Sequence, residues 1–401
     1  MGNMPIVCNS YIKRCCNVFA AQKIVIIWLI TTIVTACLEI QRGLSEINNF
    51  LIYRGVFFHT LWQQPLYIPY PESYADINHY GPAFSIFIAP FAILPINIGC
   101  LIWCMANATI LFYAFKLLFK NSQALTFALL FCVIELSTAI HSVQFNPSVA
   151  AFIILSFVLV NQKKDGWATF FIAAGFLIKL YGIAALVFFV FSSNKKRFVL
   201  SFIGWLILLI SLPMIFSSPA FILQSYIDWA ERLVQKNQLN IAINSMQDIS
   251  AGGLLKRCFG IEKSVGLWVL ATGALIYATA LIQFKKWKNS TYRHLMLALS
   301  LIAIVIFSSS AESPTYIIAI TGVVIWFASK QHKNSLDYAL LIFVLVFTSI
   351  STTDIFPASI RSNFIIKYSI KALPCVLVYI KIVFDIINLP NLITTKPLHN
   401  D

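Results

Sequence analysis

Apolar runs near the length of a membrane-spanning helix, separated by polar breaks, follow one another along the chain. The first run, Ile24 to Ile40, approaches the ~20 residues that an α-helix needs to cross the hydrocarbon core of a bilayer. No small-residue cleavage site follows it, so we interpret it as a retained span and not as a removable signal peptide. The pattern predicts an all-α, polytopic integral membrane protein in which residues 1–401 form a single domain.

Charge divides the polar breaks into two groups. Lys and Arg gather in short breaks, and by the positive-inside rule these face the cytoplasm: 11–23, 116–120, 161–166, 192–197, 284–294 and 329–337. The other breaks hold most of the acidic residues and are predicted on the outer side. They include two large outer loops, at about 41–97 and 217–264. Both termini are then inside, and we count about twelve membrane segments.

One stretch conflicts with a simple count of spans. The breaks at 161–166 and 192–197 both look cytoplasmic, yet only about 25 apolar residues, 167–191, separate them. A short hairpin that enters from the inside and turns back near mid-membrane, with Gly182 at the turn, resolves the conflict. Such irregular backbone is tolerated only inside protein or beside a cavity. The alternative is a single span in which Lys179 snorkels or forms a structural ion pair.

The outer loops contain helical patterns of their own. Residues 48–62 place an apolar stripe on one helical face, and 225–235 show a similar pattern, so both predict helices lying at the membrane interface. Further along the first loop, prolines punctuate an apolar run and predict two short helical pieces in place of one span. These prolines are Pro82, Pro90 and Pro95.

Composition excludes several classes of protein. Only 11% of the residues are charged and 59% are hydrophobic, whereas about a quarter of an ordinary soluble domain is charged. The net charge of +14 fits cationic cytoplasmic loops, so we expect membrane lipids and no nucleic acid as partners. The nine cysteines are scattered without zinc spacing or a CxxC pair, so no metal site or disulfide framework is predicted.

Candidate chemistry lies in three outer polar sets and one buried cation. A charge at bilayer depth costs at least ~2.5–3.5 kcal/mol, so Lys179 in its apolar run requires a partner or a wet cavity. Each outer residue can also be a simple cap or turn residue, and Glu312 can cap a helix that begins near Pro314. Together, outer acids above a buried cation suit a lipid-borne phosphate and a sugar hydroxyl. The candidates are Glu46, Asn49, Asp76 and His79 in the first loop, His141 and Asn146 in the 141–147 turn, and Glu312 and Ser313.

The order of several motifs resembles glycosyltransferase family 87. These motifs are "YGPAFSIFIAPFAILP", "QFNPSVAAF", "FLIKLYG" and "AESPTYIIAITG". The resemblance implies an all-helical, C-type glycosyltransferase fold in a bacterial inner membrane, with its active site on the periplasmic side. It also implies a polyprenyl-phosphate sugar donor, typically of mannose, and a glycan or glycolipid acceptor. No cofactor is implied, although outer carboxylates could hold a hard cation.

The resemblance assigns roles to five of the candidate residues. Lys179 and Tyr181 match the family segment that would hold the donor phosphate. A catalytic aspartate is expected shortly before a tyrosine in the first outer loop, but that position is occupied by Asn49, which cannot act as a base. Either Glu46 or Asp76 then supplies the carboxylate, or the chain has diverged.

Other classes of membrane protein fit less well. A transporter or flippase of lipid-linked glycans would show inverted repeats with paired broken helices, and none is detectable. An envelope polymer ligase would carry arginine and histidine in a large outer loop, but the 217–264 loop has no histidine. A non-catalytic scaffold leaves Lys179 and Glu312 unexplained.

Overall fold

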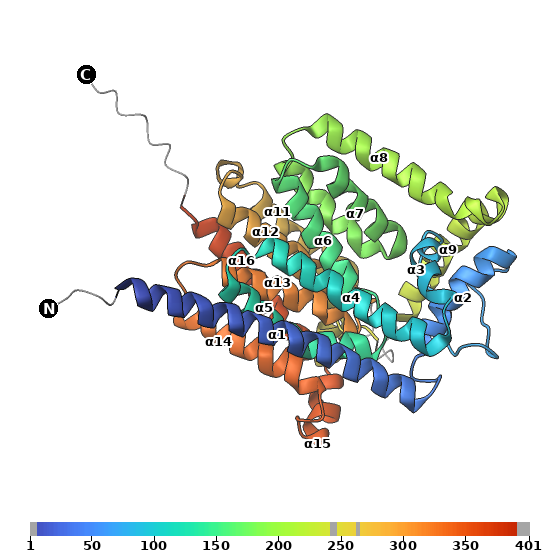
Figure 1. Ribbon diagram of the computed structural model, residues 1–401, viewed down its shortest axis with the longest axis horizontal. Helices are drawn as coiled ribbons and strands as arrows, with labels where there is room; N and C mark the ends of the chain where they lie inside the picture. Colours follow the sequence, from blue (N-terminus) through green and yellow to red (C-terminus); the bar gives the residue numbers. More distant parts are fainter. Residues whose placement is uncertain (1–5, 241–246, 262–264, 391–401) are drawn as a thin grey trace.

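The fold consists of helices packed into one bundle (Figure 1). The computed structural model describes residues 6–240, 247–261 and 265–390, with side chains from residue 23 onward, and contains no strand in these ranges. The α-helices are α1 Ile6–Arg42, α2 Asn48–Trp62, α3 Phe84–Ala92, α4 Ile96–Leu118, α5 Ser122–His141, α6 Asn146–Asn161, α7 Asp165–Ile178, α8 Lys195–Ser211, α9 Pro219–Asn240, α10 Ala251–Phe259, α11 Gly266–Leu281, α12 Ser290–Ile306, α13 Tyr316–Ser329, α14 Ser335–Val344, α15 Ala358–Ile360 and α16 Ala372–Asn388. Shorter 3₁₀ and π segments are η1 Leu180–Phe191, η2 Leu212–Ile215, η3 Phe284–Lys286, η4 Ser313–Thr315, η5 Leu345–Ser349, η6 Ile350–Thr352 and η7 Arg361–Ile366.

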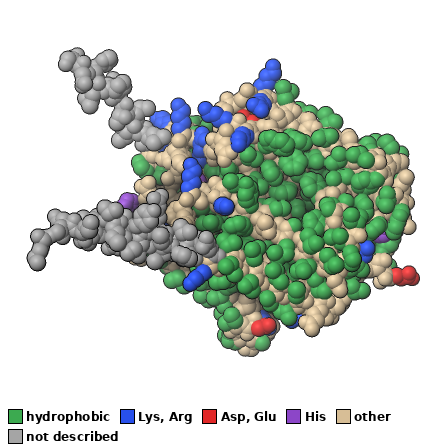
Figure 2. All heavy atoms as spheres, in the orientation of Figure 1, with side chains coloured by type: hydrophobic (Ala, Val, Ile, Leu, Met, Phe, Trp, Pro, Cys, Tyr) green, Lys and Arg blue, Asp and Glu red, His purple; other side chains and the backbone are tan. Residues whose placement is uncertain are grey.

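Helix length and surface composition define an integral membrane protein. Within the described residues, five helices are long and apolar enough to cross a membrane: Lys23–Arg42, Ile96–Leu118, Ser122–His141, Lys195–Ile215 and Ser335–Thr352. Figure 2 shows apolar side chains over the body of the visible face, with Lys and Arg gathered toward the end that carries the chain termini. The predicted total of about twelve membrane segments and the C-type fold stay predictions.

The centre of the bundle is formed by helices that are apolar on every side. On α13, all residues from Tyr316 to Phe327 are buried, and α6 is buried along nearly its whole length. By contrast, the outer helix α1 exposes Ile26, Ile30 and Leu38, as expected where a helix faces lipid and not water.

The predicted hairpin at 167–191 is confirmed, with arms α7 and η1. Lys179 leaves the helical conformation at φ −149° and ψ 111°, and the chain then reverses. Gly182 lies against the backbone of Gly175, where an added Cβ would overlap the chain, so the close approach of the arms requires glycine.

The hairpin is about as long as the neighbouring helix α6. Its tip lies beside Asn146, the first residue of α6, because the Lys179 Nζ donates to the Asn146 Oδ1 at 2.7 Å. Fourteen residues of α-helix rise ~21 Å and twelve residues of 3₁₀-helix ~24 Å, close to the ~24 Å of the 16-residue α6. The arms are therefore as long as the helix they pack against.

The loop 41–97 folds back onto the tip of this hairpin. Its predicted helix at 48–62 is observed as α2, and the predicted 225–235 helix lies within α9. The two short pieces expected around the prolines are observed as a single short helix, α3, which contains Pro90 and ends before Pro95. The Gly81 amide donates to the Ile178 carbonyl at 3.1 Å, which joins the outer loop to the hairpin.

Candidate functional site

A polar cavity of about 550 Å³ lies where the loops 41–97 and 217–264 meet the tip of the hairpin. Segments far apart in the sequence contribute to it: the start of α2, the loop before α3, the hairpin tip, the end of α9 and the segment between α12 and α13. Its walls are formed by Asn48, Asn49, Tyr53, Asp76, His79, Tyr80, Gln144, Lys179, Leu180, Tyr181, Trp229, Leu233, Lys236, Gln247, Ile249, Ser308, Ser310, Glu312 and Ser313. Seven residues that the sequence analysis named as candidates therefore line one cavity: Asn49, Asp76, His79, Lys179, Tyr181, Glu312 and Ser313.

Lys179 is the cation at the floor of this cavity. Its ammonium group donates to the Asn146 Oδ1 at 2.7 Å and lies 5.3 Å from the centre of the Tyr181 ring and 5.6 Å from that of Tyr80. Among the described residues no carboxylate lies within 4.0 Å of the Lys179 Nζ. The charge is thus held by an amide oxygen and aromatic faces, and it keeps hydrogen-bonding capacity for an anion.

Asn146 is positioned so that its carbonyl oxygen points at Lys179. Its Nδ2 donates to the Gln144 Oε1 at 2.6 Å and to the Pro314 carbonyl at 3.0 Å. These two bonds fix the orientation of the amide, and Asn146 is fully buried beneath the cavity. It supports the lysine from below and is not one of the lining residues.

Two tyrosine rings, those of Tyr80 and Tyr181, lie beside the lysine, and their hydroxyl groups are held by hydrogen bonds. Tyr181 shares a hydrogen bond with the Ser308 Oγ at 3.1 Å and donates to the Ser310 carbonyl at 3.3 Å. Tyr53 and Tyr80 share a hydrogen bond at 3.0 Å. These contacts hold phenol groups around the Lys179 ammonium, where they can donate to an oxyanion after small rotations of the O–H bond.

Two carboxylates line the cavity in different surroundings. Glu312 accepts from the Gln144 Nε2 at 3.2 Å, and its charge acts on Lys179 and Tyr181. It also precedes the η4 turn, with its amide donating to the Thr315 Oγ1 at 3.2 Å, so it combines the capping role with a place at the cavity. Asp76 is exposed at the rim, where its carboxylate accepts from the Ile77 amide at 2.7 Å.

His79 and Asn49 lie on the wall formed by the first outer loop. Burial, with smaller contributions from Lys236 and Arg232, lowers the pKa of His79 to about 4, so the imidazole is neutral at pH 7. Neither ring nitrogen of His79 has a hydrogen-bond partner in the described part of the chain. The Asn49 Nδ2 donates to the Ser142 carbonyl at 2.7 Å, which attaches α2 to the turn after α5.

Two further candidates lie outside the cavity. Glu46 is exposed before α2. His141 ends α5 and pairs with the buried Glu39 at 2.7 Å. The remaining candidate, Ser313, lines the cavity and accepts from the Lys371 Nζ at 2.9 Å.

The Lys371–Glu135 ion pair beneath Ser313 was missed by the sequence reasoning. The Lys371 Nζ lies 2.9 and 3.1 Å from the two Glu135 oxygens, and both side chains are buried. The sequence offered one signal for this pair, because Glu135 lies within an apolar run and Lys371 lies beside one. Their pairing across 236 positions is set only by the tertiary fold, in which η5 packs against both α5 and α16. No group of three or more potential metal ligands occurs within the described residues.

These features define a polytopic helical membrane protein in which segments of two long loops, 41–97 and 217–264, and one hairpin line a polar cavity around a partly buried cation. The sequence profile of glycosyltransferase family 87 matches residues 78–314. The matched region covers more than half of the chain and contains His79, Lys179 and Glu312, and it confirms the resemblance seen in the motifs. The chain therefore belongs to glycosyltransferase family 87 and is a membrane glycosyltransferase. No curated protein matches the chain.

Proposed function

We propose that this enzyme transfers a sugar, mannose in the simplest case, from a polyprenyl phosphate to a glycan or glycolipid on the periplasmic side of a bacterial inner membrane. The observation that carries the proposal is the state of Lys179. It is a cation at the floor of a polar cavity, bound to the amide oxygen of Asn146 and without a carboxylate within 4.0 Å among the described residues. A lipid-borne phosphate would supply the missing negative charge.

The donor phosphate is assigned to the deep end of the cavity. There the Lys179 ammonium and the Tyr181 hydroxyl would donate to phosphate oxygens, and such charge-assisted bonds strengthen as negative charge develops on the leaving group. The acceptor hydroxyl oxygen forms a bond to the anomeric carbon, and the bond from that carbon to the phosphate oxygen breaks. Polyprenyl phosphate leaves with the electron pair.

The proton of the attacking hydroxyl requires a base away from the phosphate. Asp76 is our choice, because it is exposed at the rim of the cavity, where an acceptor can reach it. Glu312, whose charge acts on Lys179, would be repelled by a phosphate and suits the role of an acceptor of sugar hydroxyl bonds. Neutral His79 and Ser313 would bind further hydroxyl groups, while Asn49 serves to position α2.

The proposal is tested by measuring the transfer of the sugar directly. Purified protein in lipid would be incubated with radiolabelled polyprenyl-phosphate mannose and a membrane glycan extract, beside Lys179→Met. Label moving to the extract with the wild-type protein and not with the variant is the expected result. Donor binding without transfer would point to another acceptor or base, and absence of donor binding would overturn the proposal in favour of a transporter or scaffold.

A further inference from the structure

A groove of about 640 Å³ lies on the surface of α6, between α4 and α7. Both of these helices pack against α6, so side chains of α6 form the floor of the groove. It shares no lining residue with the cavity around Lys179. The groove is therefore a separate space, which the sugar transfer proposed above does not use.

The floor of the groove is apolar and about as long as one leaflet of a bilayer. On α6 the lining residues Phe152, Leu155 and Leu159 recur at helical spacing, and Gln162 follows at the end of the helix. The chain from Phe152 to Gln162 rises ~15 Å, which is half of the ~30 Å hydrocarbon core of a bilayer. On the α4 side, Tyr113 is 53% exposed, so the groove opens to the lipid-facing surface.

Four lysines with exposed side chains lie at or beside one end of this groove. Lys164 lines the groove, and Lys163 precedes it in the chain. Lys116 and Lys120 flank Leu117, which lines the groove at the end of α4. None of the four ammonium groups forms a hydrogen bond or an ion pair within the part of the chain that the structure describes. Their positive charge is available to an anion from outside the chain.

Several cations in the other Lys- and Arg-rich breaks are partnered by the protein itself. The Lys330 Nζ lies 2.7 Å from the Asp337 carboxylate. Lys286 donates to two backbone carbonyl oxygens at the end of α16, and Arg293 donates to the Asn161 Oδ1 at 2.7 Å. The end of the groove differs, because the bundle gathers cations there without supplying their counter-charge.

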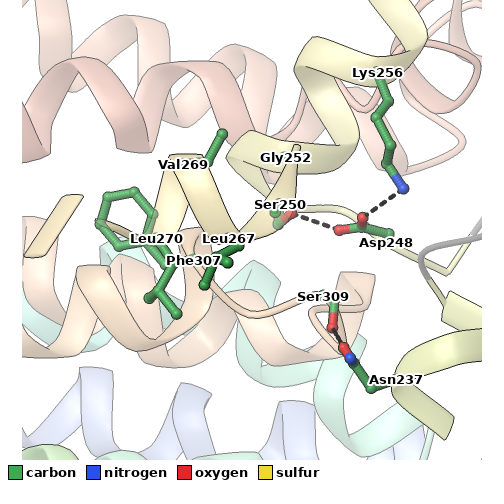
Figure 3. A pocket seen from close by; sticks show the side chains of 11 residues that line it. Asn237, Asp248, Ser250, Gly252, Lys256, Leu267, Val269, Leu270, Phe307 and Ser309 are labelled. Atoms are coloured by element: carbon green, nitrogen blue, oxygen red, sulfur yellow. Dashed lines mark hydrogen bonds and ion pairs between the residues drawn. The ribbon is translucent and has the colours of Figure 1, made fainter. Parts of the chain in front are cut away.

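A smaller cavity, of about 260 Å³, lies beside the cavity around Lys179 and has its charges paired (Figure 3). Residues of the segment 247–250 line both of these cavities. The charged residues that line the smaller one are Asp248 and Lys256. Figure 3 shows them pointing toward each other, with the carboxylate 3.1 Å from the Nζ. This pair balances its own charge, so an ionic ligand is favoured at the groove and not here.

We propose that the groove between α4, α6 and α7 binds an anionic phospholipid. One acyl chain would lie along Phe152, Leu155 and Leu159, and the phosphate would accept charge-assisted hydrogen bonds from Gln162 and Lys164. Basic pockets between membrane helices bind anionic lipid head groups, and each further lysine nearby adds to the attraction. The positive-inside rule predicts this end of the groove in the cytoplasm, so the lipid would come from the cytoplasmic leaflet.

The bound lipid would hold the start of the hairpin in place. Lys164 directly precedes α7, whose other end leads to Lys179. Asp165, the first residue of α7, is buried and its charge acts on Lys195 at the start of α8, so the protein balances part of this adjacent negative charge. A phosphate at Lys164 would then join α7 to the end of α4. This inference does not depend on the proposed sugar transfer.

The test is native mass spectrometry of the purified full-length protein in a mild detergent, mixed with phosphatidylglycerol or with phosphatidylethanolamine of the same acyl chains. We expect the protein to retain one phosphatidylglycerol at concentrations at which it does not retain the zwitterionic lipid. Lys164→Gln should weaken the binding of phosphatidylglycerol about fivefold, the effect of one cation near a lipid head group. Lys288→Gln, the loss of an exposed lysine that does not line the groove, should bind the lipid as the wild type does.

A second variant tests the apolar part of the groove. Thr109 lines the groove and is exposed, so Thr109→Trp fills the space without disturbing the core. It should weaken the binding of phosphatidylglycerol about tenfold, the loss expected when ~2 methylene groups no longer enter the groove. Ile207→Trp, at an exposed position of α8 that does not line the groove, should bind the lipid normally.

Four outcomes would overturn the lipid site. Equal retention of phosphatidylethanolamine would show that the lysines do not select the head group, and displacement by glycerol phosphate would indicate a site for a free phosphate. Displacement by an equal amount of polyprenyl phosphate would assign the groove to the donor chain. Unchanged binding in both folded variants, Lys164→Gln and Thr109→Trp, would place the lipid elsewhere. Because binding is measured without turnover, a failure of sugar transfer would be seen separately.

Discussion

Replacing Lys179 by methionine removes the charge from the cavity at the hairpin tip while keeping a side chain of similar length. In the structure one of the three N–H groups is used on Asn146, at 2.7 Å. Two N–H groups remain for phosphate oxygens. Hydrogen bonds to charged groups contribute ~1.5–3 kcal/mol each, so the loss amounts to ~3–6 kcal/mol in the transition state.

At ~1.4 kcal/mol for each factor of ten, this loss corresponds to a fall in kcat/KM of roughly 10²–10⁴ for Lys179→Met. The folded protein should persist, because the variant also removes the cost of desolvating an ammonium group, which offsets the unpaired Asn146 oxygen. The assay is transfer of radiolabelled mannose from polyprenyl phosphate, with the amount of folded protein measured by size-exclusion chromatography.

Lys286→Met is the matched control for the loss of a buried lysine. Lys286 donates to the carbonyl oxygens of Ile386 and Ile387 at 2.8 and 2.7 Å and does not line the cavity around Lys179. Its variant should affect the thermal stability without the fall in turnover per folded molecule. If Lys179→Met keeps kcat/KM within about threefold of the wild type, the phosphate role of this lysine is refuted.

Four further predictions concern the cavity and its supports. Asp76→Asn should lower kcat by ~10² or more, the scale of losing a general base. Glu46→Gln, at an exposed residue outside the cavity, should leave kcat unchanged. Normal turnover in Asp76→Asn would direct attention to Glu312. Gly81→Ala should prevent accumulation of folded protein, since its Cβ would overlap the Leu177 carbonyl. Gly204→Ala, with open space around it, should fold normally. In-gel fluorescence of a tagged protein measures the amount of folded protein for both variants. Lys371→Met should cost ~3–5 kcal/mol of stability by leaving the buried Glu135 unpaired. Adding Glu135→Gln should recover part of this loss, as measured by thermal unfolding. A double variant that is less stable than Lys371→Met alone would contradict the prediction. Burial lowers the pKa of His79 from 6.5 to about 4. The contribution of neutral His79 to the free energy of unfolding should therefore be complete above pH ~6.5 and be lost as the pH falls toward 4. The free energy of unfolding should change by at most ~1.4 kcal/mol per pH unit in this range, and His79→Gln should remove that dependence.

The charge pattern of the sequence predicted the hairpin but not all of its geometry. Two cationic breaks too close for two spans predicted a reversal between them, and the reversal is observed at Lys179. The length of the second arm was not predictable, because η1 is a 3₁₀-helix and rises more per residue than an α-helix. That conformation is set by tertiary packing, in which η1 contacts α6, α7 and α12.

The candidate site was predicted in part. Lone polar residues in apolar surroundings identified Lys179 and Glu312, because the cost of burying charge makes such residues stand out in any membrane sequence. His141 looked equally suitable, yet it pairs with Glu39 away from the cavity. The difference lies in which way each helix end faces, which is set by helix rotation within the bundle.

The sequence by itself determined that this protein is an all-helical membrane protein with a reversal at 167–191 and a charge that needs a partner. These conclusions follow from free energies of transfer between water and lipid, which depend on local composition alone. Tertiary structure decided which outer residues meet around Lys179, which charges pair beneath them, as Lys371 does with Glu135, and where a second cavity opens beside the first. Those relations join residues up to hundreds of positions apart, and only the packing of helices brings them together.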